Sequence, residues 1–366
     1  MTHLGYGIDF TMTPFLVIWE TTQACDLACQ HCRASAQPNR RPEELSTAEG
    51  KALLGQIREM GTPIVVLSGG DPLKRPDLFE LVEHGKSLGL RMATIPAATS
   101  LLTRETVQKL ANAGLDQIAF SLDFPASELH DEFRGAPGAF EKTLHAIGWA
   151  REFGIPVQIN TTVTSQSLPF IREMGELVKK LGIVFWEVFF LVPTGRGDSL
   201  ATLDPWECEA AFVSLYEVHK TGKFILKVIE APHYRRYAAQ REKSGRELPE
   251  MLRVAEGPGA SMGRSPKAVN AGRGFMFISY RGDIYPSGFL PLRAGNFRLT
   301  KIQDVYRHST LFRDLREVSK LKGICGQCEY GEICGGSRSR AFALTGDHLE
   351  SDPWCIYSLE PEPVVH

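Results

Sequence analysis

The chain has 366 residues, of which 43% are hydrophobic and 23% charged, a composition that allows a globular fold with a sizeable core. Its formal net charge of −2 gives no electrostatic basis for holding a nucleic acid. No apolar run approaches the ~18 residues of a membrane span, and the first residues lack the basic and apolar stretches of a signal peptide. We therefore expect a cytoplasmic protein with neither a nucleic acid nor a membrane as partner, in which grouped cysteines indicate metal rather than disulfide bonds.

Segments with strand-like and helix-like patterns alternate from residue 15 to residue 219. The predicted strands cover residues 15–20, 63–67, 91–95, 117–122, 157–163 and 184–191, and the predicted helices cover residues 48–60, 77–88, 104–113, 140–153, 171–181 and 204–219. This alternation implies parallel strands joined by right-handed crossovers. The six units are fewer than the eight of a complete barrel, so we expect an α/β fold of the open, partial (β/α)6 TIM-like barrel type. Its ligand site should lie at the carboxyl ends of the strands.

Three cysteines follow the first predicted strand: Cys25, Cys29 and Cys32. Thiolates at this spacing can hold three corners of an iron–sulfur cube, whereas electron-transfer clusters normally use four cysteines. The fourth iron would then be open to a substrate or cofactor, and the cluster could take part in chemistry. A zinc site with a distant fourth ligand and three unrelated thiols are the alternatives that this spacing leaves open.

Glycines and carboxylates stand at the ends of two further predicted strands. Gly69 and Gly70 follow the second strand and allow a close backbone approach, so exposed carbonyls could accept from an ammonium group. Asp71 comes next, and an ordinary turn between strand and helix is the alternative for this run. Ser121 and Asp123 close the fourth strand, where residues two apart point to the same face and can reach one ligand together. Helix capping is the alternative for Asp123.

Two more polar residues are candidates for ligand contacts. Asn160 lies within the fifth strand, where a polar side chain is either hydrogen-bonded structure or a ligand contact. Arg196 follows the sixth strand, in a loop that faces either the active site or solvent. Cys208 stands alone on a predicted helix, and we expect it to be a small apolar residue there.

A second group of cysteines lies near the end of the chain. Four thiolates satisfy a complete iron–sulfur cluster with no open corner, and a zinc ribbon is the alternative. Just before this group, residues 275–279 and 283–285 predict a hairpin. The four cysteines are Cys325, Cys328, Cys334 and Cys355.

Residues 233–273 are rich in basic side chains, glycine and proline. One interpretation of this composition is a solvated linker. The other is a mobile cover whose guanidinium groups meet substrate carboxylates, since the arginine fork suits them. The basic residues are Arg235, Arg236, Arg241, Lys243, Arg246, Arg253, Arg264, Lys267 and Arg273.

The spacing Cys-x3-Cys-x2-Cys resembles the signature of the radical S-adenosylmethionine (SAM) superfamily. The resemblance implies a catalytic [4Fe–4S] cluster on Cys25, Cys29 and Cys32, whose open iron is chelated by the amino and carboxylate groups of SAM. It also implies reductive cleavage of SAM to a 5′-deoxyadenosyl radical that abstracts hydrogen from the substrate. A reducing electron donor such as flavodoxin or ferredoxin would then be a partner.

The same resemblance gives roles to the candidate cofactor contacts. The Gly69, Gly70 and Asp71 run looks like the Gly-Gly-Glu motif of the family, which contacts the SAM amine, with Asp in place of Glu. Family members have residues for the ribose, the methionyl part and the adenine of SAM at positions similar to Ser121, Asp123, Arg196 and His31. Asn160 joins these candidates, and Arg134 is a further, weaker one.

The C-terminal cysteines resemble the SPASM/twitch extension of radical SAM enzymes. A full SPASM module carries two auxiliary clusters, but Ser287 and Arg338 stand where its further cysteines are expected. We therefore expect one auxiliary [4Fe–4S] cluster, acting as an electron relay or substrate anchor. The expected domains are a partial barrel over residues 14–220, a basic linker or active-site cover over 221–274, and an auxiliary-cluster domain over 275–360.

Within the superfamily, the chain is similar to members that modify tetrapyrrole side chains in alternative haem and haem d1 synthesis. A basic segment would suit a substrate with several propionates, and we expect a tetrapyrrole substrate on these grounds. The first alternative is a ribosomal-peptide maturase, which forms cross-links or epimerises residues. Only about 13 residues precede the first strand, too few for a leader-binding domain. The second alternative is a non-catalytic iron–sulfur or zinc protein.

Overall fold

The computed structural model describes residues 8–247, 249, 252 and 267–357. Its centre is one ten-stranded sheet with the order β10-β9-β8-β1-β2-β3-β4-β5-β6-β7. The strands from β1 to β7 are parallel, as is the pairing of β1 with β8. The strands are β1 (Leu16–Glu20), β2 (Ile64–Ser68), β3 (Arg91–Thr94), β4 (Gln117–Ser121), β5 (Val157–Val163), β6 (Phe185–Phe190), β7 (Ile225–Ile229), β8 (Phe275–Ile278), β9 (Asp283–Tyr285) and β10 (Gly295–Asn296).

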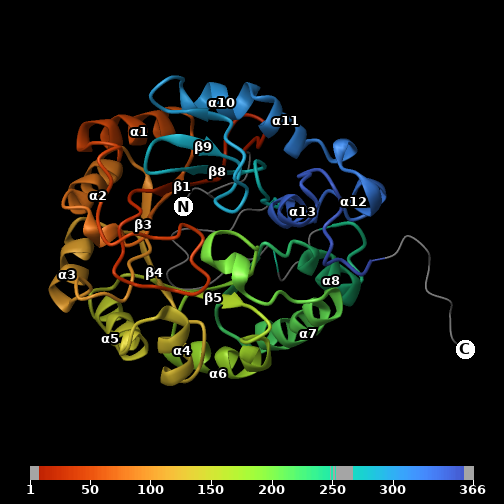
Figure 1. Cartoon of the computed structure of the whole chain (residues 1–366), viewed down its shortest axis with the longest axis horizontal. Coiled ribbons are helices and arrows are strands. Elements are labelled where there is room, and N and C mark those ends of the chain that lie inside the picture. Colours follow the sequence, from red (N-terminus) through yellow and green to blue (C-terminus); the bar gives the residue numbers. More distant parts are fainter. Residues whose placement is uncertain (1–7, 248, 250–251, 253–266, 358–366) are drawn as a thin grey trace, which may run out of the picture.

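Helices surround this sheet and form an outer ring (Figure 1). Each barrel helix buries one apolar stripe against the strands, as an amphipathic helix does. The helices are α1 (Thr47–Glu59), α2 (Leu78–Ser87), α3 (Arg104–Asn112), α4 (Ser127–Arg134), α5 (Ala139–Glu152), α6 (Ile171–Leu181), α7 (Pro205–Thr221), α8 (His233–Glu242), α10 (Ile302–His308), α11 (Thr310–Arg316), α12 (Gly323–Gln327) and α13 (Arg338–Thr345).

The predicted open barrel is confirmed, and a seventh unit extends it. All six predicted strand–helix pairs are present, and β7 with α8 follows the helix that was expected to be the last. The barrel does not close, because β7 and β10 are the two edges of the sheet in the described residues.

The predicted hairpin is also present, but it belongs to the barrel sheet. β8 and β9 pair antiparallel, and β8 pairs in parallel with β1, with Leu16 opposite Phe275. The C-terminal region is therefore joined to the barrel by a continuous hydrogen-bonded ladder.

The basic segment, residues 233–273, begins with the helix α8 rather than with the solvated linker that was one interpretation of its composition. α8 buries His233, Tyr234 and Tyr237, and all three rings contact the Phe212 ring of α7. Aromatic packing of this kind anchors the helix to the barrel. Arg253 and Arg264, which the sequence analysis counted in this segment, lie outside the described residues.

The packing of α1 on β1 requires a small residue. Gly50 faces Trp19, which is completely buried, and a Cβ at Gly50 would lie 2.6 Å from the Trp19 ring. Gly55, on the same helix, has no atom within 4 Å of such a Cβ.

We therefore expect opposite effects from the same substitution at these two positions. Gly50→Ala forces the helix away from the sheet, and overpacking of this kind destabilises by about 1–3 kcal/mol. Gly55→Ala removes backbone entropy from the unfolded chain and stabilises by about 0.5–1 kcal/mol. The midpoint of anaerobic thermal unfolding should fall for the first variant and rise for the second. Shifts of equal sign would contradict the packing described for α1.

Candidate functional site

The three N-terminal cysteines line one cavity of about 470 Å³ inside the barrel. Their loop leaves the carboxyl end of β1, which is where parallel α/β folds bind ligands. The backbone N–H of Leu27 donates to the Cys25 Sγ atom at 3.4 Å, and the Arg134 guanidinium donates to the Cys29 Sγ atom at 3.7 Å. Hydrogen bonds to ligand sulfurs are among the features that tune iron–sulfur clusters.

The chemistry of this donor set fits a bound cluster. Burial raises the pKa of the Cys25 thiol to about 12, so the thiolate needs a metal to stabilise it. Within the described ranges, no three His, Cys, Asp or Glu side chains converge on a point that could hold a single metal ion. A cubane places each thiolate on a different iron, so its ligands need not converge in this way.

Gly69 and Gly70 hold the cysteine loop against the end of β2. The Gly70 N–H donates to the Thr22 carbonyl at 2.8 Å, and the Asp71 N–H donates to the Ala24 carbonyl at 2.7 Å. A Cβ at either glycine would lie 2.5 Å from a carbonyl oxygen of that loop. Two backbones can approach this closely only where one of them lacks side chains.

The Asp71 carboxylate does not line the cavity. It accepts from the Leu73 N–H at 3.1 Å, from the Ala97 N–H at 3.3 Å and from the Thr99 hydroxyl at 2.7 Å. Its side chain is completely buried, and burial raises its pKa. In this structure Asp71 joins the loops after β2 and β3, and only its two glycine neighbours face the cavity.

Asp123 also lies behind the cavity wall, where it positions Arg134. Its buried carboxylate is 2.5 Å from the Arg134 guanidinium and accepts from the Thr162 N–H at 2.8 Å. Burial, the largest single influence, would raise the pKa of Asp123, but the Arg134 guanidinium, the His31 and His130 rings and the Thr162 N–H together lower it. Arg134 itself lines the cavity, as does Ser121.

His31 lines the cavity as a neutral ring. It stacks on Phe133, with ring centroids 4.4 Å apart and an interplanar angle of 11°. Burial lowers the pKa of His31 to about 3, and its buried Nδ1 atom has no partner among the described residues. A polar atom in this state is available to a ligand.

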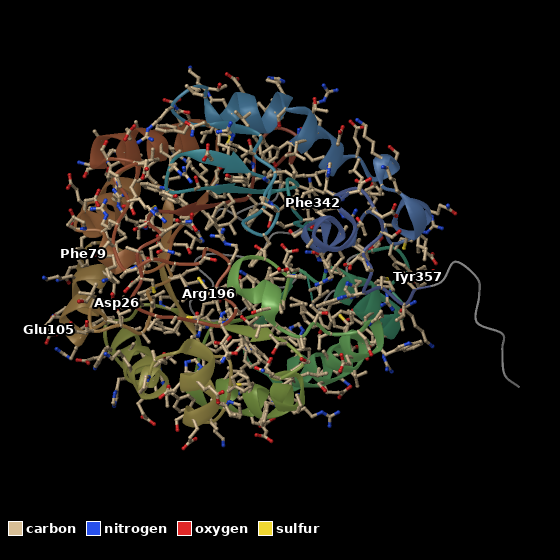
Figure 2. The ribbon with its side chains drawn as sticks, viewed as in Figure 1. Asp26, Phe79, Glu105, Arg196, Phe342 and Tyr357 are labelled. Carbon is tan, nitrogen blue, oxygen red and sulfur yellow. The ribbon has the colours of Figure 1, made fainter. Side chains whose placement is uncertain are left out.

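Arg196 approaches the cysteine loop from the opposite side. Its backbone N–H donates to the Cys32 carbonyl at 3.0 Å, and the Nε–H of its side chain donates to the Cys29 carbonyl at 2.9 Å. Its Nη2 atom is buried and has no partner in the described chain. Gly195, at φ 59°, permits this approach, because a Cβ there would overlap the Arg33 carbonyl. Figure 2 shows Arg196 inside the ring of helices, far from Phe79 and Glu105 at its edge.

Asn160 completes the set of cavity residues that were expected from the sequence. It lies opposite Ser121 in the β4–β5 ladder and lines the cavity, and its Oδ1 atom accepts from the Gln158 amide at 2.8 Å. Six of the eight predicted cofactor contacts thus line one cavity, and Asp71 and Asp123 support its wall from behind.

Two ion pairs in the cavity wall were not expected. Arg33 donates to Glu20 at 2.5 Å, and Lys227 lies 3.0 Å from Glu187. Of these four residues, Arg33, Lys227 and Glu187 line the cavity. The sequence did contain one signal for the second pair. Glu187 is a single charged residue among the apolar residues of a predicted strand, and a charge in such a position indicates a polar partner nearby.

The four C-terminal cysteines surround a second, small cavity of about 20 Å³. The Gly336 N–H donates to the Cys334 Sγ atom and the Asp352 N–H to the Cys325 Sγ atom, each at 3.4 Å. Arg338 also donates to the Cys325 Sγ atom, at 3.7 Å. These donors favour thiolates, the ligand form of cysteine. Cys208 is completely buried outside both groups, 3.2 Å from the Nε2 atom of His233.

The positions that depart from a full SPASM pattern are both buried. Ser287 donates to the Glu230 carboxylate at 3.2 Å, which also accepts from Ser337 at 2.5 Å and from Ser339 at 3.0 Å. Arg338 is 2% exposed and places a cation beside Cys325. Direct hydrogen bonds to the Glu230 carboxylate thus connect Ser287 with Ser337 and Ser339.

No helix in the described part of the chain is long and apolar enough to span a bilayer.

Comparison with known proteins identifies the family of this chain. The sequence model of the Radical SAM superfamily matches residues 19–169. The chain is 42% identical to the AdoMet-dependent heme synthase of Methanosarcina barkeri, over 96% of this chain and 98% of that one. It is 40% identical to the enzyme of the same name from Oleidesulfovibrio alaskensis, over 96% and 89%. The fold is similar to Streptococcus suis SuiB, solved with S-adenosylmethionine bound, at a TM-score of 0.70 and 20% identity, over 94% and 78%.

The two cysteine groups predict separate losses of iron. Cys29→Ala and Cys328→Ala should each reduce the iron content of anaerobically purified protein from about eight to about four atoms per chain. Cys208→Ser is the matched control, because this cysteine is buried but belongs to neither group, and it should retain about eight. Elemental analysis for iron and zinc is the measurement, and stoichiometric zinc in place of iron would contradict the assignment.

Proposed function

This chain belongs to the radical SAM superfamily, and on that premise we propose that it modifies the side chains of a tetrapyrrole in haem synthesis. The observation that carries the proposal is identity above 40% over nearly the whole chain with a protein named AdoMet-dependent heme synthase. The cavity supports it, since its volume of about 470 Å³ lies in the range of small-molecule and cofactor sites.

The residues of the first site each have a proposed role. When bound, the [4Fe–4S] cluster and SAM supply a 5′-deoxyadenosyl radical that removes a hydrogen atom from the substrate. Cys25, Cys29 and Cys32 would hold the cluster. The unpartnered Nδ1 atom of His31 and Nη2 atom of Arg196 would bind SAM, together with the backbone around Gly69 and Gly70.

The proposed reaction converts a propionate side chain to a vinyl group. Such a side chain must lose one hydrogen atom, one carboxyl group as CO₂ and one electron. The hydrogen atom goes to the deoxyadenosyl radical, which becomes 5′-deoxyadenosine, while the new double bond forms as the bond to the carboxyl carbon breaks. The leaving electron needs a one-electron acceptor.

We propose an auxiliary [4Fe–4S] cluster at the four C-terminal cysteines as that acceptor. Four cysteines that line one small cavity, with amide donors to their sulfur atoms, support it. One auxiliary cluster fits better than two, because Ser287 and its neighbours satisfy Glu230 directly. A flavodoxin- or ferredoxin-like donor in the cytoplasm would reduce the first cluster, since such clusters persist in reducing compartments.

The peptide-maturase alternative has less support. The likeness to SuiB concerns the fold, which many functions can share. The relatives at 40% identity or more carry haem synthase names.

The proposal is tested by incubating the reconstituted protein anaerobically with SAM, dithionite and iron coproporphyrin III. We expect products that lack first one and then two carboxyl groups, with 5′-deoxyadenosine formed in step, as measured by liquid chromatography and mass spectrometry. Cys29→Ala should give neither product. An unchanged porphyrin beside abundant 5′-deoxyadenosine would reject the tetrapyrrole and leave a peptide substrate as the next candidate.

The buried Asp123–Arg134 pair predicts a positioning effect on SAM cleavage. Asp123→Asn removes the charge that orients Arg134 next to Cys29, and loss of an outer-shell partner costs about 10–100-fold in metal-site activity. We expect a decrease of that size in the rate of 5′-deoxyadenosine formation, with iron content retained. Asp314→Asn is the matched control, because Asp314 of α11 pairs with Lys320 and neither residue lines either cavity. Equal rates in the two variants would show that Arg134 needs no partner.

A further inference from the structure

The cations that line the large cavity differ in how they are neutralised. Arg33, Arg134 and Lys227 each have a carboxylate partner within 3.0 Å, namely Glu20, Asp123 and Glu187 respectively. A charge in a cavity wall is stable when it is paired in this way. These three cations therefore have little capacity left for an anionic ligand.

Arg235 of α8 is also part of the cavity wall but has no carboxylate partner among the described residues. Its Nη1 atom donates to the Ile333 carbonyl at 3.1 Å and its Nη2 atom to the Val269 carbonyl at 2.6 Å. A guanidinium has five N–H donors and stays protonated in proteins. Two bonds to neutral carbonyls leave three donors for a ligand. A thiolate at Cys334 favours the positive charge, but no carboxylate of the described chain pairs with it.

The position of Arg235 separates it from the SAM-binding end. Arg196, which also has no carboxylate partner, is tied to the carbonyls of Cys29 and Cys32 and so belongs to the first site. Arg235 is tied to Ile333, the residue before Cys334, and so lies between the cavity and the auxiliary cysteines.

The other described basic residues nearby are directed elsewhere. Arg236 pairs with Glu209, Arg246 with Glu329 and Arg273 with Glu332, and these three do not line the large cavity. Lys267 does line it, and its ammonium group donates to the Ile8 carbonyl at 3.0 Å. The cation that faces the cavity from α8 is therefore a single residue rather than a basic surface.

We propose that Arg235 is the anchor for a substrate carboxylate at the auxiliary end of the cavity. The planar guanidinium can bind a carboxylate with two parallel hydrogen bonds, and the bound anion would supply the carboxylate partner that Arg235 lacks in the described chain. The inference rests on the proposed function, because it assigns to the substrate the carboxylates that a tetrapyrrole carries. It places one carboxylate next to the cysteines that would receive the leaving electron.

The test is a binding titration of the iron-loaded protein with iron coproporphyrin III, followed by its Soret absorbance. Arg235→Gln removes the charge and should weaken binding roughly ten-fold or more, the effect of losing a hydrogen bond to a charged group. Arg235→Lys keeps the charge without the fork and should weaken binding by a smaller factor. Arg246→Gln is the matched control, since that side chain is 75% exposed and pairs with Glu329, and it should bind as the wild type does.

A second probe separates charge recognition from shape. The tetramethyl ester of the same porphyrin carries no carboxylates, so its affinity should be equal for wild type and Arg235→Gln. Equal affinities of these two proteins for the free acid would overturn the proposal. If Arg235→Gln loses iron from the auxiliary site, the Arg235→Lys variant provides the test instead. Weaker binding of the porphyrin by Arg235→Lys at full iron content supports the proposal, and unchanged binding overturns it. Failure of the wild type to bind the free acid would instead reject the tetrapyrrole substrate itself.

Discussion

The close contact of three backbone segments at the barrel mouth is the constraint on which the rest of the structure depends. The loop that carries Cys25, Cys29 and Cys32 is held on one side by the N–H groups of Gly70 and Asp71, and on the other by that of Arg196. Glycines make both approaches possible, since a Cβ at Gly69, Gly70 or Gly195 would meet a carbonyl oxygen at 2.5 Å or less. These contacts hold the cysteine loop in place, and a site that generates a radical needs such preorganisation.

Buried charge divides the cavity into two ends with different purposes. At the cysteine end, Asp123 neutralises Arg134, and the unpartnered atoms of His31 and Arg196 remain for a cofactor. At the other end, Arg235 is satisfied by neutral carbonyls alone in the described chain. Since a charge without a close partner is costly in a low dielectric, an anionic ligand would be stabilised there.

Sequence patterns predicted the repeating units because short apolar strands and amphipathic helices have strong local signals. They predicted side-chain direction less well. Ser121 and Asp123 were expected to face one ligand, but β4 ends at Ser121, so the two-residue alternation does not extend to Asp123. Asp71 was expected at the SAM amine, but its carboxylate caps the following turn, as short acidic side chains often do. The pairing of β8 with β1 joins distant parts of the chain and has no local pattern at all.

That pairing fixes how the two cysteine sites sit relative to each other. β1 delivers the first cysteine loop at its carboxyl end, and β8, its hydrogen-bonded neighbour, leads into β9 and on to Ser287. Ser287, Ser337 and Ser339 then converge on Glu230, just after β7, so the auxiliary region is tied to both sides of the open barrel. A sheet ladder and a buried polar network are stiffer than a linker. Electron transfer weakens steeply with distance, so the proposed reaction requires a fixed separation between the two cysteine sites. In that reaction one bound substrate would give a hydrogen atom at one end of the cavity and an electron at the other.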